Sequence, residues 1–208
     1  IGSLDRRTDI TLFPLIEFTI GANVQSGTLD NILVTVQDDE GIIYSDTYEV
    51  VVGIPQLLIN QPFENVNNGW TVGSPSDDAT SGVWEWGNPN ETSQSGNIIQ
   101  PGDDHTPAGT NCFITGNSVS TSVGFDDVDG GKTTLYSPLF DLGSETGVLL
   151  GYWRWYSNEL GDNPETDRWI VEYSNNAGSD WFELENTTMP ERNWIEKQFN
   201  ISCPAKLC

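Results

Sequence analysis

The sequence predicts an all-β protein, and three observations lead to this prediction. Short runs of alternating apolar and polar residues recur along the chain, which is the pattern of strands with one buried face. The 208 residues include 21 Gly, eight Trp, six Tyr and eight Phe, and glycine-rich turns with aromatic strands are typical of sheet proteins. No segment carries the apolar spacing of an amphipathic helix. The aromatic residues also supply enough apolar mass for a folded core despite the high charge.

The charge balance restricts the partners that the protein can have. Eight Lys and Arg residues stand against 31 Asp and Glu residues, which gives a formal net charge of −23. Such a surface repels nucleic acid phosphates and anionic membranes and attracts cations. No apolar run is long enough to span a bilayer, so we expect neither nucleic acid binding nor membrane insertion. A chain rich in acidic residues and poor in Lys and Cys is typical of secreted bacterial proteins, which predicts an extracellular location.

The first 53 residues are interpreted as a partial immunoglobulin-like β segment. Alternating runs occupy residues 15–20, 31–37 and 44–52. An Asp-Asp-Glu-Gly stretch that ends at Gly41 separates the last two runs and indicates a hairpin turn. Three strands cannot bury both faces of a sheet, so we expect this segment to pack on the next domain. Gly53-Ile54-Pro55 marks the boundary, which predicts domains at 1–53 and 54–208.

The second domain contains most of the expected strands. After Trp70, which begins one of them, the runs lie at residues 112–115, 133–137, 148–156, 168–174, 181–185 and 194–201. A long polar stretch at 73–110 interrupts them, and within it Val-Trp-Glu-Trp at 83–86 would place Trp84 and Trp86 on one face of a strand. Two interpretations of these tryptophans stay open. They pack in the core, or they form an exposed ligand-binding face that stacks on sugar rings.

The stretch from Asp103 to Pro138 concentrates the residues that could carry chemistry. It holds the only histidine of the chain, His105, and two acidic clusters between short apolar runs. Carboxylates on loops between strands offer the hard oxygen ligands that calcium prefers. Asp and Gly also crowd ordinary turns, because Asp bonds its own backbone and Gly accepts a positive φ. For residues 126–131 a metal loop and a turn therefore stay open as alternatives.

The motifs of the second domain occur in the order found in the MAM family. Phe63-Glu64 with Gly69-Trp70 is followed by Asp-His-Thr-x-x-Gly-Thr at 104–110, Leu-Tyr-Ser-Pro-Leu-Phe-Asp-Leu at 135–142 and Gly-Tyr-Trp-Arg-Trp-Tyr at 151–156. Over about residues 57–196 the chain resembles the MAM-like jelly-roll modules of secreted bacterial peptidases and surface proteins. The resemblance implies a jelly-roll β-sandwich with an adhesive or binding role. Its ligand would be a carbohydrate or a protein, and a structural calcium is often bound.

The resemblance also indicates where a cation would bind. Glu64 and Asp104 match the glutamate and aspartate that the family associates with its cation site. Asp127 and Asp129 lie in the Asp-x-Asp-Gly loop that bacterial members share. We add Asp167 to this predicted set because it opens a strand at the end of an acidic loop. The expected cofactor is therefore calcium or another divalent metal.

Two classes of function follow from these residues. The first is a non-catalytic extracellular module for adhesion or ligand binding, stabilised by a cation. The second is a metal-dependent hydrolase with promiscuous activity on activated esters or phosphoesters. In that alternative a carboxylate-bound cation with an open position polarises the substrate, and His105 beside Asp104 is the catalytic candidate. The sequence contains no Gly-x-Ser-x-Gly, His-Glu-x-x-His or phosphate-loop motif, which favours the binding module.

The C-terminus predicts an incomplete sheet. Family members continue past the strand at 194–201, whereas this chain reads Ser-Cys-Pro-Ala-Lys-Leu-Cys and stops. We expect a piece of a longer protein, truncated at both ends, whose jelly roll lacks its closing strand. An open edge pairs with another strand, supplied by residues 1–53 or by a second copy in a homodimer. The odd number of cysteines, three in all, leaves at least one thiol free or available to bridge copies.

Overall fold

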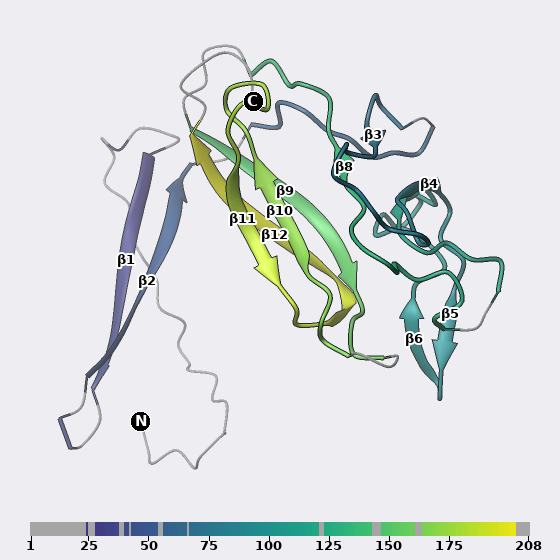
Figure 1. The fold of residues 1–208 in the computed structure, drawn as a ribbon. Coiled ribbons are helices and arrows are strands. Elements are labelled where there is room, and N and C mark those ends of the chain that lie inside the picture. Colours follow the sequence, from purple (N-terminus) through teal and green to yellow (C-terminus); the bar gives the residue numbers. More distant parts are fainter. Residues whose placement is uncertain are drawn as a thin grey trace. The chain divides into compact units, whose positions relative to one another are not determined.

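The computed structural model confirms the predicted all-β class (Figure 1). It describes residues 24, 28–37, 40–41, 43–53, 56–65, 67–120, 123–142, 147–160 and 164–202. Every regular element within them is a strand, and every strand pairing is antiparallel. The strand expected at residues 15–20 lies outside the described residues. The chain divides into two compact units, Ile1–Gln56 and Leu57–Cys208.

The first unit contains a β-hairpin of β1 (Thr28–Gln37) and β2 (Ile43–Val52). The two strands pair in register from Thr28 opposite Val52 to Gln37 opposite Ile43. Gly41 has a φ of +83°, a conformation that suits glycine in the connecting turn. Both expected strands and the hairpin that joins them are thus confirmed. The expected packing of this segment on the second domain stays a prediction.

The second unit is built on four longer strands. These strands are β9 (Gly147–Tyr156), β10 (Trp169–Tyr173), β11 (Phe182–Thr187) and β12 (Glu191–Ser202). β9 pairs with β12, and β10 pairs with β11. All four were expected from their alternating sequences, although β12 begins earlier than the expected residue 194.

These two strand pairs pack face to face, as in a β-sandwich (Figure 1). Side chains alternate between the two faces of a strand, so Tyr152 and Arg154 of β9 project toward β10–β11. Arg154 accordingly bonds Glu185 of β11, with 2.7 Å between Nη2 and Oε1. Trp153 and Trp155 project to the opposite face, where the Trp155 indole donates to the carbonyl of Ile99.

Three short strand pairs accompany the sandwich. They are β3 (Thr71–Val72) with β8 (Leu135–Tyr136), β4 (Glu85–Gly87) with β7 (Cys112–Ile114), and β5 (Thr92–Gln94) with β6 (Asn97–Gln100). The β5–β6 hairpin lies inside the polar stretch 73–110, whose sequence does not alternate in the way that predicts strands. Its turn residues Ser95 and Gly96 have φ angles of +52° and +81°, as a tight hairpin turn requires. The Ser-Gly dipeptide was the missed signal.

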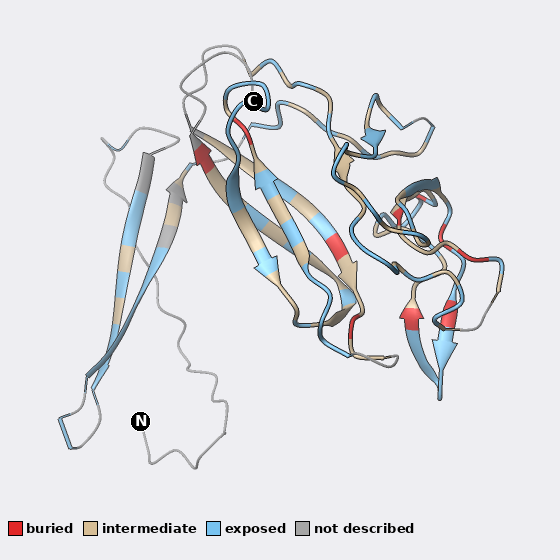
Figure 2. Ribbon diagram, viewed as in Figure 1, coloured by how far each residue is buried: buried red, intermediate tan, exposed pale blue. Residues whose placement is uncertain are grey.

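Few of the described residues are fully buried (Figure 2). Among the described residues the buried hydrophobic side chains are Ile99, Ile114 and Ile201. Buried polar or charged residues are more numerous: Thr92, Ser118, Arg154, Asn158 and Ser174. Half-buried aromatic rings also pack against one another, as Trp84 does against Trp169.

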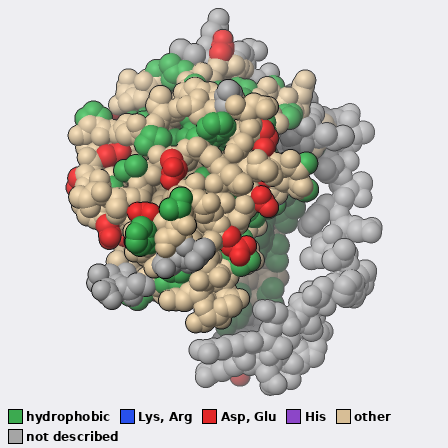
Figure 3. Space-filling model, turned by 90° about the vertical axis from the view of Figure 1, so that its right-hand side faces the viewer, with side chains coloured by type: hydrophobic (Ala, Val, Ile, Leu, Met, Phe, Trp, Pro, Cys, Tyr) green, Lys and Arg blue, Asp and Glu red, His purple; other side chains and the backbone are tan. Residues whose placement is uncertain are grey.

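The surface matches the acidic composition. Figure 3 shows acidic side chains spread among hydrophobic and uncharged ones over the face that it presents. Within the described part of the chain, no helix has the length and apolarity needed to cross a membrane.

Candidate functional site

The Phe-Glu and Gly-Trp motif forms an aromatic turn that positions Glu64. Phe63 has a φ of +60°, which is unusual for a bulky residue. Its ring packs edge-on against Trp70 and Phe113, with ring centroids 5.4 and 5.2 Å apart. Its carbonyl accepts a 2.8 Å hydrogen bond from the Trp86 indole. These contacts hold a strained backbone, and strain of this kind is often found at functional sites.

Glu64 and Asp104 come together over the backbone of Gly109. Thr110 N–H donates to Glu64 Oε2 at 3.0 Å, and Thr106 N–H donates to Asp104 Oδ1 at 2.9 Å. A Cβ atom added to Gly109 would lie 2.2 Å from Glu64 Oε1 and 2.7 Å from Asp104 Oδ2. The Asp-His-Thr-x-x-Gly-Thr motif is therefore a loop that brings two carboxylates together, and its glycine leaves room for both.

The Glu64–Asp104 carboxylate pair is a candidate site for a cation. Glu64 Oε1 is buried without a hydrogen-bond donor. Burial, together with the nearby charge of Glu64, raises the pKa of Asp104 above its usual value, despite the hydrogen bonds from Thr106. Two adjacent carboxylates both stay ionised only when a cation offsets their repulsion; without one, the pair holds a proton. The hard oxygens of this pair fit calcium, whose remaining ligands would be backbone oxygens or water.

The other predicted ligands form a separate acidic region. Ser81 Oγ donates to the Asp127 carbonyl at 2.8 Å, and Thr80 N–H donates to the Asp129 carbonyl at 2.8 Å. Burial, then the charges of Asp129 and Asp167, raise the pKa of Asp127. No group of three or more His, Cys, Asp or Glu side chains within the described residues is placed to hold one metal ion. The structure therefore does not gather the five predicted ligands at one centre.

His105 is packed between aromatic rings. Its imidazole stacks on Trp153, with centroids 3.5 Å apart and planes 14° apart. The Trp194 ring lies 6.4 Å away in an edge-to-face arrangement. His105 therefore docks the Asp104 loop onto the outer face of the β9–β12 pair.

The prediction that Trp84 and Trp86 lie on one strand is wrong, because β4 contains Trp86 and begins after Trp84. Trp84 precedes β4 and packs edge-on against Trp169, with ring centroids 5.9 Å apart. Its backbone N–H donates to Thr133 Oγ1 at 3.2 Å. Trp86 lies in β4, is 38% exposed, and is held by the Phe63 carbonyl. Trp84 thus has a packing role here, and ligand binding by either tryptophan stays a prediction.

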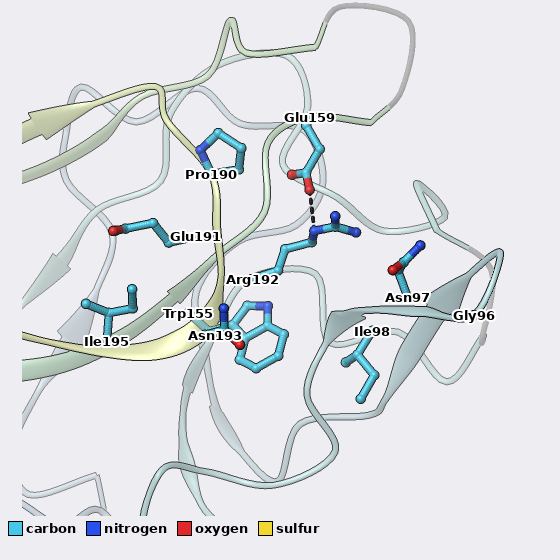
Figure 4. Close-up of a pocket in the computed structure, with 10 residues that line it drawn as sticks. All are labelled: Gly96, Asn97, Ile98, Trp155, Glu159, Pro190, Glu191, Arg192, Asn193 and Ile195. Atoms are coloured by element: carbon cyan, nitrogen blue, oxygen red, sulfur yellow. Dashed lines mark ion pairs between the residues drawn. The ribbon is translucent and has the colours of Figure 1, made fainter. Parts of the chain in front are cut away.

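A cleft of about 740 Å³ lies between the β5–β6 hairpin and the start of β12 (Figure 4). Trp155 of β9 lines it, with the hairpin residues Asn97 and Ile98 on one side. On the other side Arg192 forms an ion pair with Glu159, and Asn193 lies beside the indole. Sequence reasoning missed this cleft because three distant segments form it. The exposed Asn residues gave no local signal.

Cys112 lies near the Glu64–Asp104 pair, and its thiol is expected to be unreactive. Burial, reinforced by the charges of Asp104 and Glu64, raises the pKa of the Cys112 thiol to about 12. We expect Cys112 in the native protein to resist iodoacetamide at pH 8, because the thiolate is the reactive species. Peptide mass spectrometry should find it alkylated only after denaturation. Rapid labelling of Cys112 in the native state contradicts this prediction.

No protein-family model, curated protein or solved structure matches this chain. The likeness to MAM modules therefore stays a prediction from sequence motifs.

Proposed function

We propose that this protein is a non-catalytic extracellular binding module, adhesive in type and stabilised by a divalent cation, with calcium the best fit. The observation that carries the proposal is the Glu64–Asp104 pair, in which a buried carboxylate oxygen has no hydrogen-bond donor. The net charge of −23 favours cation binding in the same direction. The order of the MAM-like motifs and the acid-rich composition support secretion and a glycan or protein ligand.

The contacts of nearby residues favour binding over catalysis. The alternative, a metal-dependent hydrolase of activated esters or phosphoesters, would use His105 as its base. A general base must reach the proton that it removes, whereas the His105 ring is stacked on Trp153. The raised pKa of Cys112 leaves that thiol protonated at neutral pH. We expect no chelator-sensitive turnover of chromogenic ester or phosphoester substrates, and such turnover supports the hydrolase instead.

Calcium is expected to raise the thermal stability of the protein. At 100 times its dissociation constant a ligand of the native state adds about 2.7 kcal/mol, which for a chain of this size is a rise in Tm of about 5–10 °C. Thermal unfolding in excess calcium and in excess chelator measures this difference. Glu64→Gln and Asp104→Asn should abolish most of it.

The control for this experiment is Glu172→Gln, which removes an exposed carboxylate of β10. This variant should keep the full calcium response. If wild-type protein unfolds at the same temperature in calcium and in chelator, the cation part of the proposal is wrong.

The proposal includes a homodimer formed through a sheet edge. Within the described residues, β9 and β12 form a two-stranded sheet, so each strand has an edge with backbone groups available to a further strand. Light scattering in the presence of calcium should give the mass of a dimer. A monomer mass at micromolar concentration supports closure by residues of the same chain instead.

A further inference from the structure

We infer that the cleft between the β5–β6 hairpin and the start of β12 binds a neutral sugar ring. The inference rests on the proposed binding function and adds the ligand class and the place where it binds.

The Trp155 indole supplies a fixed aromatic surface in the cleft. Its Nε1–H donates to the Ile99 carbonyl at 2.7 Å, which ties the indole to β6. Its ring also packs edge-on against Trp194, with centroids 6.2 Å apart. Figure 4 shows the indole between Asn193 and Ile98, and the Ile98 side chain is 44% exposed. A rigid aromatic face with an apolar neighbour suits the C–H face of a sugar ring, and little conformational entropy is lost on binding.

Polar groups surround this apolar surface. Asn97 and Asn193 are exposed, and each amide offers both hydrogen-bond donors and an acceptor. Arg192 and Glu159 form an ion pair in which both side chains stay partly accessible, at 33% and 22%. Sugar hydroxyl groups both donate and accept hydrogen bonds, so amides beside an Arg–carboxylate pair match them. A few convergent polar groups around an apolar surface are typical of small-molecule sites, as is a volume of this size.

The charges of the cleft select a neutral ligand. Glu159 is paired with Arg192, and Glu191 is paired with Arg154. The described residues that line the cleft therefore offer no unpaired cationic group for a phosphate or a uronate. The net charge of −23 further disfavours anionic ligands. A purely apolar ligand would bury these polar groups without partners, which costs free energy. A neutral saccharide satisfies both conditions.

The test begins with the full chain on a panel of immobilised neutral and uronate-containing oligosaccharides. The neutral oligosaccharide with the strongest signal is then titrated by calorimetry. Asn97→Ala, Asn193→Ala and Arg192→Ala should each weaken binding about 3- to 10-fold, as the loss of one hydrogen bond predicts. Trp155→Phe keeps an aromatic ring for packing and should also weaken binding. Gln198→Ala is the matched control, because it removes an exposed amide of β12 outside the cleft, and it should bind as wild type does.

Several results would overturn this inference. If the protein binds no neutral saccharide on the panel, the proposed ligand class is wrong. If it binds only uronate-containing saccharides, the preference for a neutral ligand is wrong. If all four cleft variants unfold at the wild-type temperature and bind the saccharide as wild type does, the ligand binds outside the cleft. In that last case the proposed binding function still stands. Capture of a protein ligand with no saccharide binding also keeps the proposed function while refuting the cleft inference.

Discussion

Replacing Arg154 with alanine is expected to lower the free energy of unfolding by about 3–5 kcal/mol, the usual cost of breaking a buried ion pair. The Arg154 side chain is only 2% exposed. Its Nε and Nη2 atoms both donate to Glu185, at 3.1 and 2.7 Å from Oε1, and Nη2 also pairs with Glu191. Without Arg154, Lys197 is the cation of the described residues that still pairs with these carboxylates, with its Nζ 3.8 Å from Glu185 and 3.2 Å from Glu191. Glu185 also keeps the hydrogen bond from the Tyr152 hydroxyl. The loss is therefore mainly the cost of a buried charge without its partner.

The pH dependence of stability offers a second readout of this network. Burial raises the pKa of Glu185, but hydrogen bonds from Arg154 and Tyr152 outweigh it, so this pKa lies below its usual value. A carboxyl group with a lowered folded-state pKa stabilises the protein above its unfolded-state pKa, and this contribution is lost as the pH falls through the folded-state value. The free energy of unfolding of the wild-type protein should therefore fall as the pH is lowered from the unfolded-state pKa of Glu185 through its folded-state pKa. The Arg154→Ala variant should show a shallower acid dependence.

Urea unfolding followed by circular dichroism measures the difference, with Arg192→Ala as control. Arg192 pairs with Glu159 near the surface, where both side chains are partly exposed. Its removal should cost no more than about 1 kcal/mol. If both arginine variants lose the same free energy of unfolding, the buried Arg154 network stabilises the protein no more than the exposed Arg192–Glu159 pair does.

The Gly82→Ala substitution is the second change with a large expected effect. Gly82 has a φ of +64°, and an added Cβ would lie 2.4 Å from the Asp127 carbonyl carbon and 2.5 Å from its oxygen. The backbone conformation alone costs an L-residue about 1–2 kcal/mol, and overpacking adds about 1–3 kcal/mol. The two segments cannot separate freely, because Ser81 Oγ and Thr80 N–H bond the carbonyls of Asp127 and Asp129.

Gly73→Ala separates these two contributions. Gly73 also has a positive φ, +101°, but nothing lies within 4 Å of its added Cβ. Its substitution should cost only the backbone term. Calorimetric unfolding of both variants tests the comparison, and a Gly82→Ala protein as stable as Gly73→Ala would argue against the close contact with Asp127.

The long strands could be predicted from the sequence because their alternation reflects local geometry. In β9 the residues Tyr152 to Tyr156 alternate between two packed faces, and this pattern is visible in the sequence alone. The β5–β6 hairpin escaped prediction because its strands are polar and short. Of the predicted metal ligands, Glu64 and Asp104 lie together, whereas Asp127, Asp129 and Asp167 do not join them.

Residue type alone could not predict that separation. It depends on the path of loops whose ends are fixed by distant contacts, such as the Phe63 turn held by the Trp86 indole. The cleft around Trp155 depends on the same kind of long-range assembly. In the sequence, Trp155 is visible only as part of the Gly-Tyr-Trp-Arg-Trp-Tyr run at 151–156.

The buried Arg154 network also bears on how the strands choose their alignment. A strand that slips by two residues presents the same face to the interior, so hydrocarbon packing alone discriminates weakly against such misalignment. In β9 a two-residue slip would bring Tyr152 or Tyr156 to the place of Arg154 and leave Glu185 and Glu191 without their guanidinium partner. Apolar replacements often match or exceed the stability of a buried ion network. The buried charges therefore favour the native register of β9 over registers shifted by two residues. A uniformly apolar interior would distinguish these registers less well.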